Sequence, residues 1–163
     1  MIPYGKQNID ADDLAALTEV LQSAWLTQGP KVPAFEQAVA EHGKARFAIA
    51  VNSATSALHI ACLALEVGSG DSVWTSPNSF VASANCARYC GASVDFVDIE
   101  LTTGNMCMAA LESKLFAAKQ SNTLPKVVIP VHFAGQTCDM QNIAALAQEY
   151  GFKVIEDASH AIG

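Results

Sequence analysis

The chain has 163 residues, of which 51% are hydrophobic and 15% are charged, and its net charge is -7. This length and balance are typical of one folded globular domain and exclude a disordered chain. The sequence has no cluster of basic residues, no apolar core near its start and no run of ~18 apolar residues. These absences argue against nucleic acid, secretion and a membrane, so we expect a cytoplasmic protein.

Residues 1–45 are expected to form a helical segment that precedes a sheet domain. Asp10 is the expected N-cap of a first helix, because its side chain can accept hydrogen bonds from the first backbone N–H groups. The apolar residues of this helix recur at helical spacing and are Leu14, Leu17, Leu21 and Trp25. A second helix is expected over residues 33–41, and Gly43 ends it. Its inward-facing residues would be Phe35, Ala38 and Val39.

Residues 46–163 alternate between strands and helices, which predicts an α/β domain with a mainly parallel sheet. The expected strands are apolar runs at residues 47–51, 72–75, 94–97, 126–131 and 152–155. The expected helices lie at residues 57–65, 80–89 and 111–119, and from Asp139 to a stop at Gly151. The sequence ends just after the last of these strands, where a doubly wound domain would continue with another crossover. We therefore expect the domain to be incomplete.

Ligands of open parallel sheets bind beyond the carboxyl ends of the strands. After the first expected strand, residues 52–56 (Asn-Ser-Ala-Thr-Ser) open a helix, whose free N–H groups and positive dipole end suit a phosphate. The alternative is ordinary helix capping by Ser53 or Thr55. The sequence contains neither a GxGxxG turn after this strand nor a GxxxxGK[ST] loop, which argues against a nicotinamide or ATP site.

Four further residues follow expected strands at the same edge of the sheet. Phe80 could stack on a flat heterocycle or belong to the core. Asp157 could pair with a pyridinium nitrogen and keep it protonated, which would make the ring an electron sink, or it could cap a helix or bind a metal. His132 and His160 could each contact a ligand or be structural histidines.

The sequence offers no metal site. It has five scattered cysteines and no CxxC pair, so free thiols are expected. Cys86 and Cys90 are four residues apart on one expected helix, and they are interpreted as small buried residues because no other ligands lie nearby in sequence.

Taken in order, these features resemble the DegT/DnrJ/EryC1/StrS family of PLP-dependent sugar aminotransferases. The resemblance covers the whole chain, and its strength lies in the order and spacing of the motifs rather than in any one of them. The matching segments are Trp-Leu-Thr-Gln-Gly-Pro at 25–30, Phe-Glu at 35–36, Asn-Ser-Ala-Thr-Ser-Ala-Leu-His at 52–59, Ser-Phe-Val-Ala-Ser-Ala-Asn at 79–85, Val-His-Phe-Ala-Gly-Gln at 131–136 and Glu-Asp-Ala-Ser-His-Ala-Ile-Gly at 156–163.

The resemblance implies the large domain of a fold type I PLP-dependent transferase, with each functional residue assigned by its motif. The residues that would hold the cofactor phosphate are Ala54, Thr55 and Ser56. Phe80 would stack on the pyridine ring, Asp157 would pair with the ring nitrogen, and His160 would lie near the phenolic oxygen. The residues that would lie near the sugar substrate are Tyr4, Thr27 and Gln28.

Within the family, the motifs most resemble members that aminate a 4-keto-6-deoxy UDP-sugar in pseudaminic acid biosynthesis, with glutamate as amino donor and a homodimer as the assembly. Family members carry their Schiff-base lysine in a later segment, beyond Gly163, so we expect this 163-residue chain to be inactive by itself. Three alternatives stay open: a sugar dehydratase of the same family, a non-catalytic remnant that only binds PLP or dimerises, and a nucleotide-binding Rossmann protein.

Overall fold

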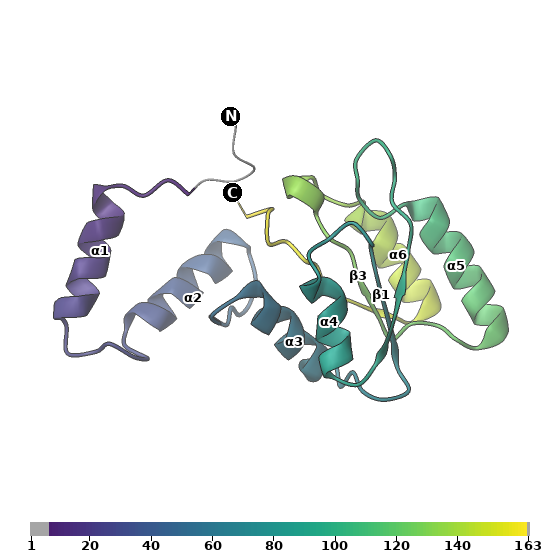
Figure 1. Cartoon of the computed structure of the whole chain (residues 1–163), viewed down its shortest axis with the longest axis horizontal. Coiled ribbons are helices and arrows are strands. Elements are labelled where there is room, and N and C mark those ends of the chain that lie inside the picture. The colour runs from purple at the N-terminus through teal and green to yellow at the C-terminus, as the bar shows by residue number, and fades with distance from the viewer. Residues whose placement is uncertain (1–6, 163) are drawn as a thin grey trace. The chain divides into compact units, whose positions relative to one another are not determined.

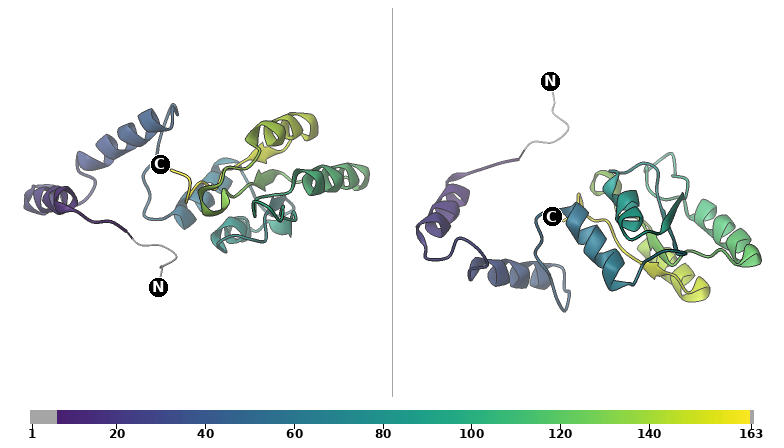
Figure 2. Two further views of the ribbon diagram at one scale, coloured as in Figure 1. Left: turned by 90° about the horizontal axis from the view of Figure 1, so that it is seen from above. Right: turned by 60° about the horizontal axis from the view of Figure 1, so that its bottom comes forward.

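A computed structural model of the chain describes residues 7–162, drawn in Figures 1 and 2. These residues form two compact units that divide between Ala50 and Val51. The first unit contains helices α1 (Ala11–Gln22) and α2 (Lys31–His42). The second contains the sheet. Among the described residues, no helix is both long and apolar enough to span a bilayer.

Helix α2 ends where its sequence predicts, whereas α1 ends at Gln22, before Trp25, which the helical spacing predicts to be part of it; neither helix has a buried face. Asp10 caps α1 as expected: its carboxylate accepts from the backbone N–H of Asp12 at 2.9 Å, and its own N–H donates to Asp13 at 3.0 Å. Gly43 is the C-cap of α2. Neither helix buries a residue, and Phe35 is 61% exposed. The expectation that Phe35 and Ala38 face inward is therefore wrong for the described residues, although Val39 is half-buried.

The second unit contains a four-stranded parallel sheet of order β2-β1-β3-β4, which confirms the predicted fold class. Its strands are β1 (Ser72–Thr75), β2 (Ser93–Phe96), β3 (Val127–Ile129) and β4 (Lys153–Val154). Its helices are α3 (Ala54–Ala64), α4 (Ala82–Tyr89), α5 (Met108–Ser121) and α6 (Met140–Tyr150), with a short 3-10 turn, η1 (Phe133–Gly135). Since β2 and β3 flank β1 on opposite sides, the chain reverses its direction of growth at β1.

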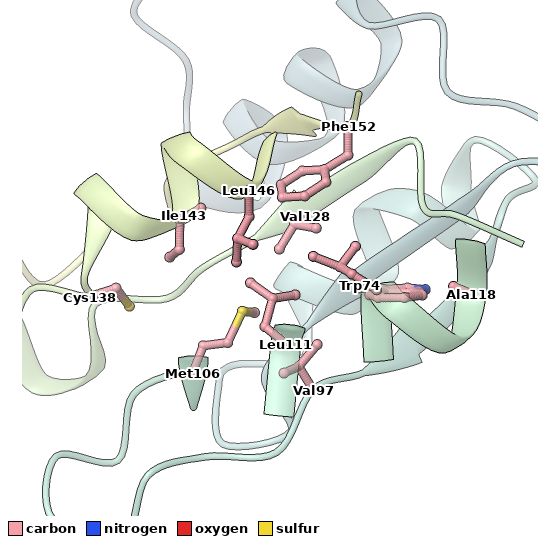
Figure 3. Packing of buried hydrophobic residues seen from close by; sticks show 11 residues of the cluster. Trp74, Val97, Met106, Leu111, Ala118, Val128, Cys138, Ile143, Leu146 and Phe152 are labelled. Carbon is pink, nitrogen blue, oxygen red and sulfur yellow. The ribbon is translucent and has the colours of Figure 1, made fainter. Parts of the chain in front are cut away.

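Two hydrophobic cores cover the two faces of this sheet, because successive strand residues point to opposite faces. Val73 contributes to the core under α3 and α4, and its neighbour Trp74 contributes to the core under α5 and α6. Figure 3 shows the second core, in which Leu111 of α5 and Ile143 of α6 meet Val128 of β3. The result is a three-layer α/β/α arrangement, with the helices on both sides in Figure 2.

The strand expected at residues 47–51 does not form, so four of the five expected strands are present among the described residues. Phe47 is 78% exposed and Ile49 is 75% exposed. A strand needs the backbone hydrogen bonds of a neighbouring strand, and no described strand pairs with this segment. The Glu36 side chain accepts a hydrogen bond from the Ala50 N–H of this segment at 2.8 Å.

An ion pair at the amino edge of the sheet predicts how stability depends on pH. Lys126 hydrogen-bonds the Asp71 carboxylate at 2.9 Å, and together with the Gly68 N–H it holds the pKa of Asp71 below its ordinary 3.8. A carboxyl with a lowered pKa in the folded state adds stability above its ordinary pKa and loses it as pH falls through the lowered value.

We therefore expect the free energy of unfolding, measured by urea denaturation, to fall as the pH is lowered below about 3.8. In the Asp71→Asn variant, the part of this fall that comes from Asp71 should be absent. The pair is partly exposed, so that part should be under about 1 kcal/mol. Parallel pH curves for the variant and the unaltered chain would contradict the expectation.

Candidate cofactor site

The carboxyl ends of β1 and β3 lie where a ligand is expected, because the strand order reverses between them. Helices α3 and α4 each lead into a parallel strand, so both begin at this same edge (Figure 1). They pack against each other through a shared core that includes Leu58 and Cys62 of α3 and Cys86 of α4. The segment after β4 also reaches this edge, because the Asp157 N–H donates to the Pro130 carbonyl at 3.0 Å.

Helix α3 begins at Ala54, earlier than expected, because Ser53 is its N-cap. The Ser53 hydroxyl accepts from the Ser56 N–H at 3.2 Å, and the Ser56 hydroxyl donates to the Asn52 side chain at 2.7 Å. Capping by Ser53 is thus real, and it engages only one of the first-turn N–H groups. The N–H groups of Ala54 and Thr55 belong to the turn that has no intrahelical acceptors. The helix start is therefore both capped and suited to an anion.

Asp157 is a buried carboxylate whose partners are hydroxyl and backbone groups. It is 7% exposed. One carboxylate oxygen accepts from the Ser83 hydroxyl at 2.7 Å, and the other accepts from the hydroxyl and the N–H of Ser159 at 2.6 Å and 3.3 Å. In the part of the chain that the structure describes, no ion pair involves Asp157. A buried anion without a cation favours a positively charged ligand.

Phe80 lies just before α4, the helix whose Ser83 binds the Asp157 carboxylate, rather than in the core. It is 74% exposed, so the interpretation of Phe80 as a core residue is wrong, and α4 begins at Ala82 rather than at Phe80. The ring borders a pocket that also includes Ser76 and Ser83. The Ser76 hydroxyl is buried and has no hydrogen-bond partner among residues 7–162. An exposed ring next to an unsatisfied hydroxyl is consistent with a ligand that has both a flat face and polar atoms.

His132 is a structural residue. It is 4% exposed, its Nδ1 accepts from the Cys138 N–H at 3.2 Å, and its Nε2 lies 3.1 Å from the Glu156 carboxylate. Because Nδ1 is an acceptor, the hydrogen on Nε2 is the one donated to Glu156. Both ring nitrogens are thus engaged by protein groups, which leaves none for a ligand.

His160 is exposed, in the segment that follows Asp157. This segment lies close to η1: a Cβ on Gly135 would lie 2.8 Å from the His160 carbonyl oxygen. Gly135 also has a φ of +87°, which side-chain-bearing residues rarely adopt. The lack of a side chain at position 135 therefore allows the His160 backbone to lie this close to η1.

Replacing Gly135 by alanine is expected to lower the free energy of unfolding by about 2 kcal/mol or more, since the backbone strain and the contact with His160 add together. Gly151→Ala is the matched control: its φ is +83°, but nothing lies within 4 Å of its Cβ position, so only the strain of about 1 kcal/mol remains. Urea denaturation of both variants measures the difference. Equal losses of unfolding free energy in the two variants would mean that the His160 segment moves away from residue 135 at no cost.

The described contacts do not test the three predicted substrate residues. Thr27 and Gln28 are exposed residues of the first unit, and Tyr4 lies outside the described residues. Their role stays a prediction. Conversely, sequence reasoning missed Ser83 and Ser76, although both lie close in sequence to Phe80. Among residues 7–162, no cluster of three or more His, Cys, Asp or Glu side chains could hold a metal, and all five cysteines are free thiols.

The reversing parallel sheet and the carboxylate buried at its switch point are features of the cofactor domain of fold type I, PLP-dependent enzymes. The chain belongs to the DegT/DnrJ/EryC1/StrS aminotransferase family, whose sequence profile matches residues 7–163. The cofactor of this family is PLP. The described residues fit it, because they offer an anion-binding helix start, an exposed aromatic ring and an uncompensated carboxylate.

Individual relatives agree with this assignment. The chain is 44% identical over 161 residues to the spore coat polysaccharide biosynthesis protein SpsC of Bacillus subtilis (strain 168), covering 99% of this chain and 40% of that protein. It superimposes on the aminotransferase PseC of Helicobacter pylori with a TM-score of 0.87 and 33% identity, over 98% of this chain and 42% of that one. For the PLP form of the sugar aminotransferase Spr1654 of Streptococcus pneumoniae, the TM-score is 0.86 at 27% identity, over 99% and 44%.

The chain therefore spans about 40% of the length of these relatives.

Proposed function

We propose that this chain supplies the first part of the cofactor domain of an enzyme that aminates a 4-keto-6-deoxy UDP-sugar with glutamate as donor. The observation that carries the proposal is Asp157, a buried carboxylate that accepts three hydrogen bonds but, among the described residues, pairs with no cation. The likeness of the chain to PseC, an aminotransferase involved in the biosynthesis of pseudoaminic acid, supports a sugar substrate of that pathway. The likeness to SpsC supports a polysaccharide precursor.

When bound, PLP supplies an electron sink for the amino group's carbon. The chain's own residues would bind and orient it. The first turn of α3, with Ala54, Thr55 and Ser56, would hold the phosphate, and the N–H groups of Ala54 and Thr55 are the ones that the Ser53 cap leaves available. The Phe80 ring would cover one face of the pyridine, and Asp157 would hold a proton on the ring nitrogen. His160 would lie near the phenolic oxygen, on the segment that packs against Gly135.

The organisation and partners of the protein are proposed in the same way. Residues 1–45 would form a helical segment and residues 46–163 the first part of the PLP-binding domain. A homodimer is supported by apolar side chains that α1, α2 and the turn between them leave exposed, namely Leu14, Leu17, Leu21, Trp25 and Phe35. Tyr4, Thr27 and Gln28 would contact the UDP-sugar, and the protein would act in the cytoplasm.

The lysines of the second unit argue that the 163-residue chain does not turn over by itself. Lys126 pairs with Asp71 at the amino edge of the sheet, and Lys114 pairs with Asp95 at 2.8 Å. Lys119 lies over the Tyr150 ring, and Lys153 begins β4 at the amino edge. Lys114 also donates to the Phe96 carbonyl at the end of β2, but none of these amines has a described contact with Asp157. We infer that the amine needed for covalent attachment of PLP comes from outside this unit.

Calorimetric titration tests the proposal directly. PLP is expected to bind the chain saturably, and no pyridoxamine phosphate is expected to form when glutamate is added. A UDP-sugar is expected to bind less tightly than PLP or not at all. A nicotinamide dinucleotide is the control ligand and is expected not to bind. Saturable binding of the dinucleotide without binding of PLP would contradict the proposed cofactor and favour a Rossmann protein.

A further inference from the structure

The Asp157 carboxylate is held by a directed chain of hydroxyl groups. Ser83, which is fully buried in the first turn of α4, lies 74 residues from Asp157 in sequence and donates to it at 2.7 Å. The Ser79 hydroxyl lies 2.7 Å from the Ser83 hydroxyl. A hydroxyl has one hydrogen to donate, and an ionised carboxylate has none. Ser83 must therefore accept from Ser79, and the chain runs from Ser79 through Ser83 to Asp157.

The two carboxylate oxygens of Asp157 bind different serines, one distant in sequence and one close to it. Ser83 on α4 binds one oxygen, and Ser159, two residues beyond the carboxylate, binds the other. Each carboxylate oxygen can accept two hydrogen bonds, so the oxygen bound by Ser83 keeps a free lone pair. The Ser159 side is more fully used, because both its N–H and its hydroxyl donate to one oxygen.

Ser83 is not needed to anchor its own helix. Its neighbours Ala82, Cys86 and Ala87 are all buried in the core shared with α3, which fixes α4 against the sheet. A buried apolar residue would serve as well at position 83 if packing were its only task. A hydroxyl at this buried position, aimed at a buried carboxylate, indicates a task in orienting that carboxylate.

We propose that Ser83 is a positioning residue for the cofactor, acting through Asp157 with support from Ser79. The inference rests on the proposed binding of PLP at this edge. Hydrogen bonds donated to a carboxylate favour its charged form. If Asp157 pairs with the pyridine nitrogen, the Ser83 hydroxyl would thus favour the proton on the ring nitrogen. It would also fix the orientation of the Asp157 carboxylate toward that nitrogen. Ser83 itself need not touch the cofactor.

The test compares variants of the chain by their affinity for PLP and by the ¹⁵N chemical shift of bound, ring-labelled PLP, which reports the protonation of the ring nitrogen. Ser83→Ala is expected to weaken binding about tenfold, as for loss of a hydrogen bond to a charged group, and to move the resonance toward the unprotonated value. Ser79→Ala should change both in the same direction by less. Ser72→Ala is the control, because it removes a hydroxyl at the amino edge that accepts from Trp74 at 3.2 Å.

Ser83→Cys keeps the size of the side chain with a weaker donor, so it gives the answer if Ser83→Ala does not fold; it is expected to lie between Ser83→Ala and the unaltered chain. Unchanged affinity and ¹⁵N shift in folded Ser83→Ala or Ser83→Cys would overturn the inference while leaving PLP binding intact. If the unaltered chain binds no PLP, the proposed function fails and this inference fails with it. Equal losses in Ser72→Ala would assign the effect to general destabilisation and would also overturn it.

Discussion

Replacing Asp157 by asparagine is expected to weaken PLP binding about 100-fold or more, the largest functional effect of any single change in this chain. The substitution keeps the shape of the side chain but removes the charge that would pair with the ring nitrogen, and breaking a buried charge pair costs about 3–5 kcal/mol. Titration of PLP followed by absorbance or calorimetry measures the loss.

The same variant separates binding from folding. Because the Asp157 charge is buried without a cation among the described residues, a neutral asparagine should leave the free energy of unfolding of the cofactor-free chain unchanged or raise it. Asp71→Asn is the control: it breaks the pair with Lys126 at the opposite edge of the sheet and should leave PLP binding intact. Normal affinity in Asp157→Asn would remove the central support for the proposed site.

The largest expected effect on stability comes from Leu111→Ala. Leu111 is fully buried in the core between the sheet and helices α5 and α6, and Figure 3 shows it among the buried side chains of Trp74, Val97 and Met106. Truncation of such a leucine leaves a cavity and lowers the free energy of unfolding by about 3 kcal/mol. Urea denaturation followed by circular dichroism measures the loss.

Leu101→Ala is the matched control, because Leu101 is 96% exposed and the substitution should change stability by less than about 0.5 kcal/mol. A loss below about 1 kcal/mol for Leu111→Ala would mean that the core closes over the missing atoms, contrary to the dense packing expected of a protein interior.

Much of the fold could be predicted from the sequence because helix caps, helix ends and apolar strand runs are set by residues close together in the chain. Asp10 and Asp139 cap helices through their own side chains, and Gly151 ends α6 in the left-handed conformation, as expected. The apolar run at residues 72–75 is confirmed as β1, because its residues are covered on both faces of the sheet. The fold class follows from the alternation of such segments.

The failures concern interactions between distant residues. Residues 47–51 have the composition of a buried strand, but strand formation depends on a partner that a local pattern does not specify. Phe35 lies on an apolar stripe that remains exposed in its own unit. The hydroxyl chain at Ser83 could not be predicted because its acceptor is distant in sequence, and serines at a helix start are ordinarily capping residues.

The way in which Asp157 is held has a consequence for how a cofactor would be captured. Protein groups alone fix the plane of the carboxylate, through Ser83 on one side and Ser159 on the other. The side chain therefore loses its rotational freedom during folding. The binding of a ring would not have to offset the entropic cost of that loss. The carboxylate is therefore already ordered for a ring that would pair with it, and ordering this side chain would not lower the affinity.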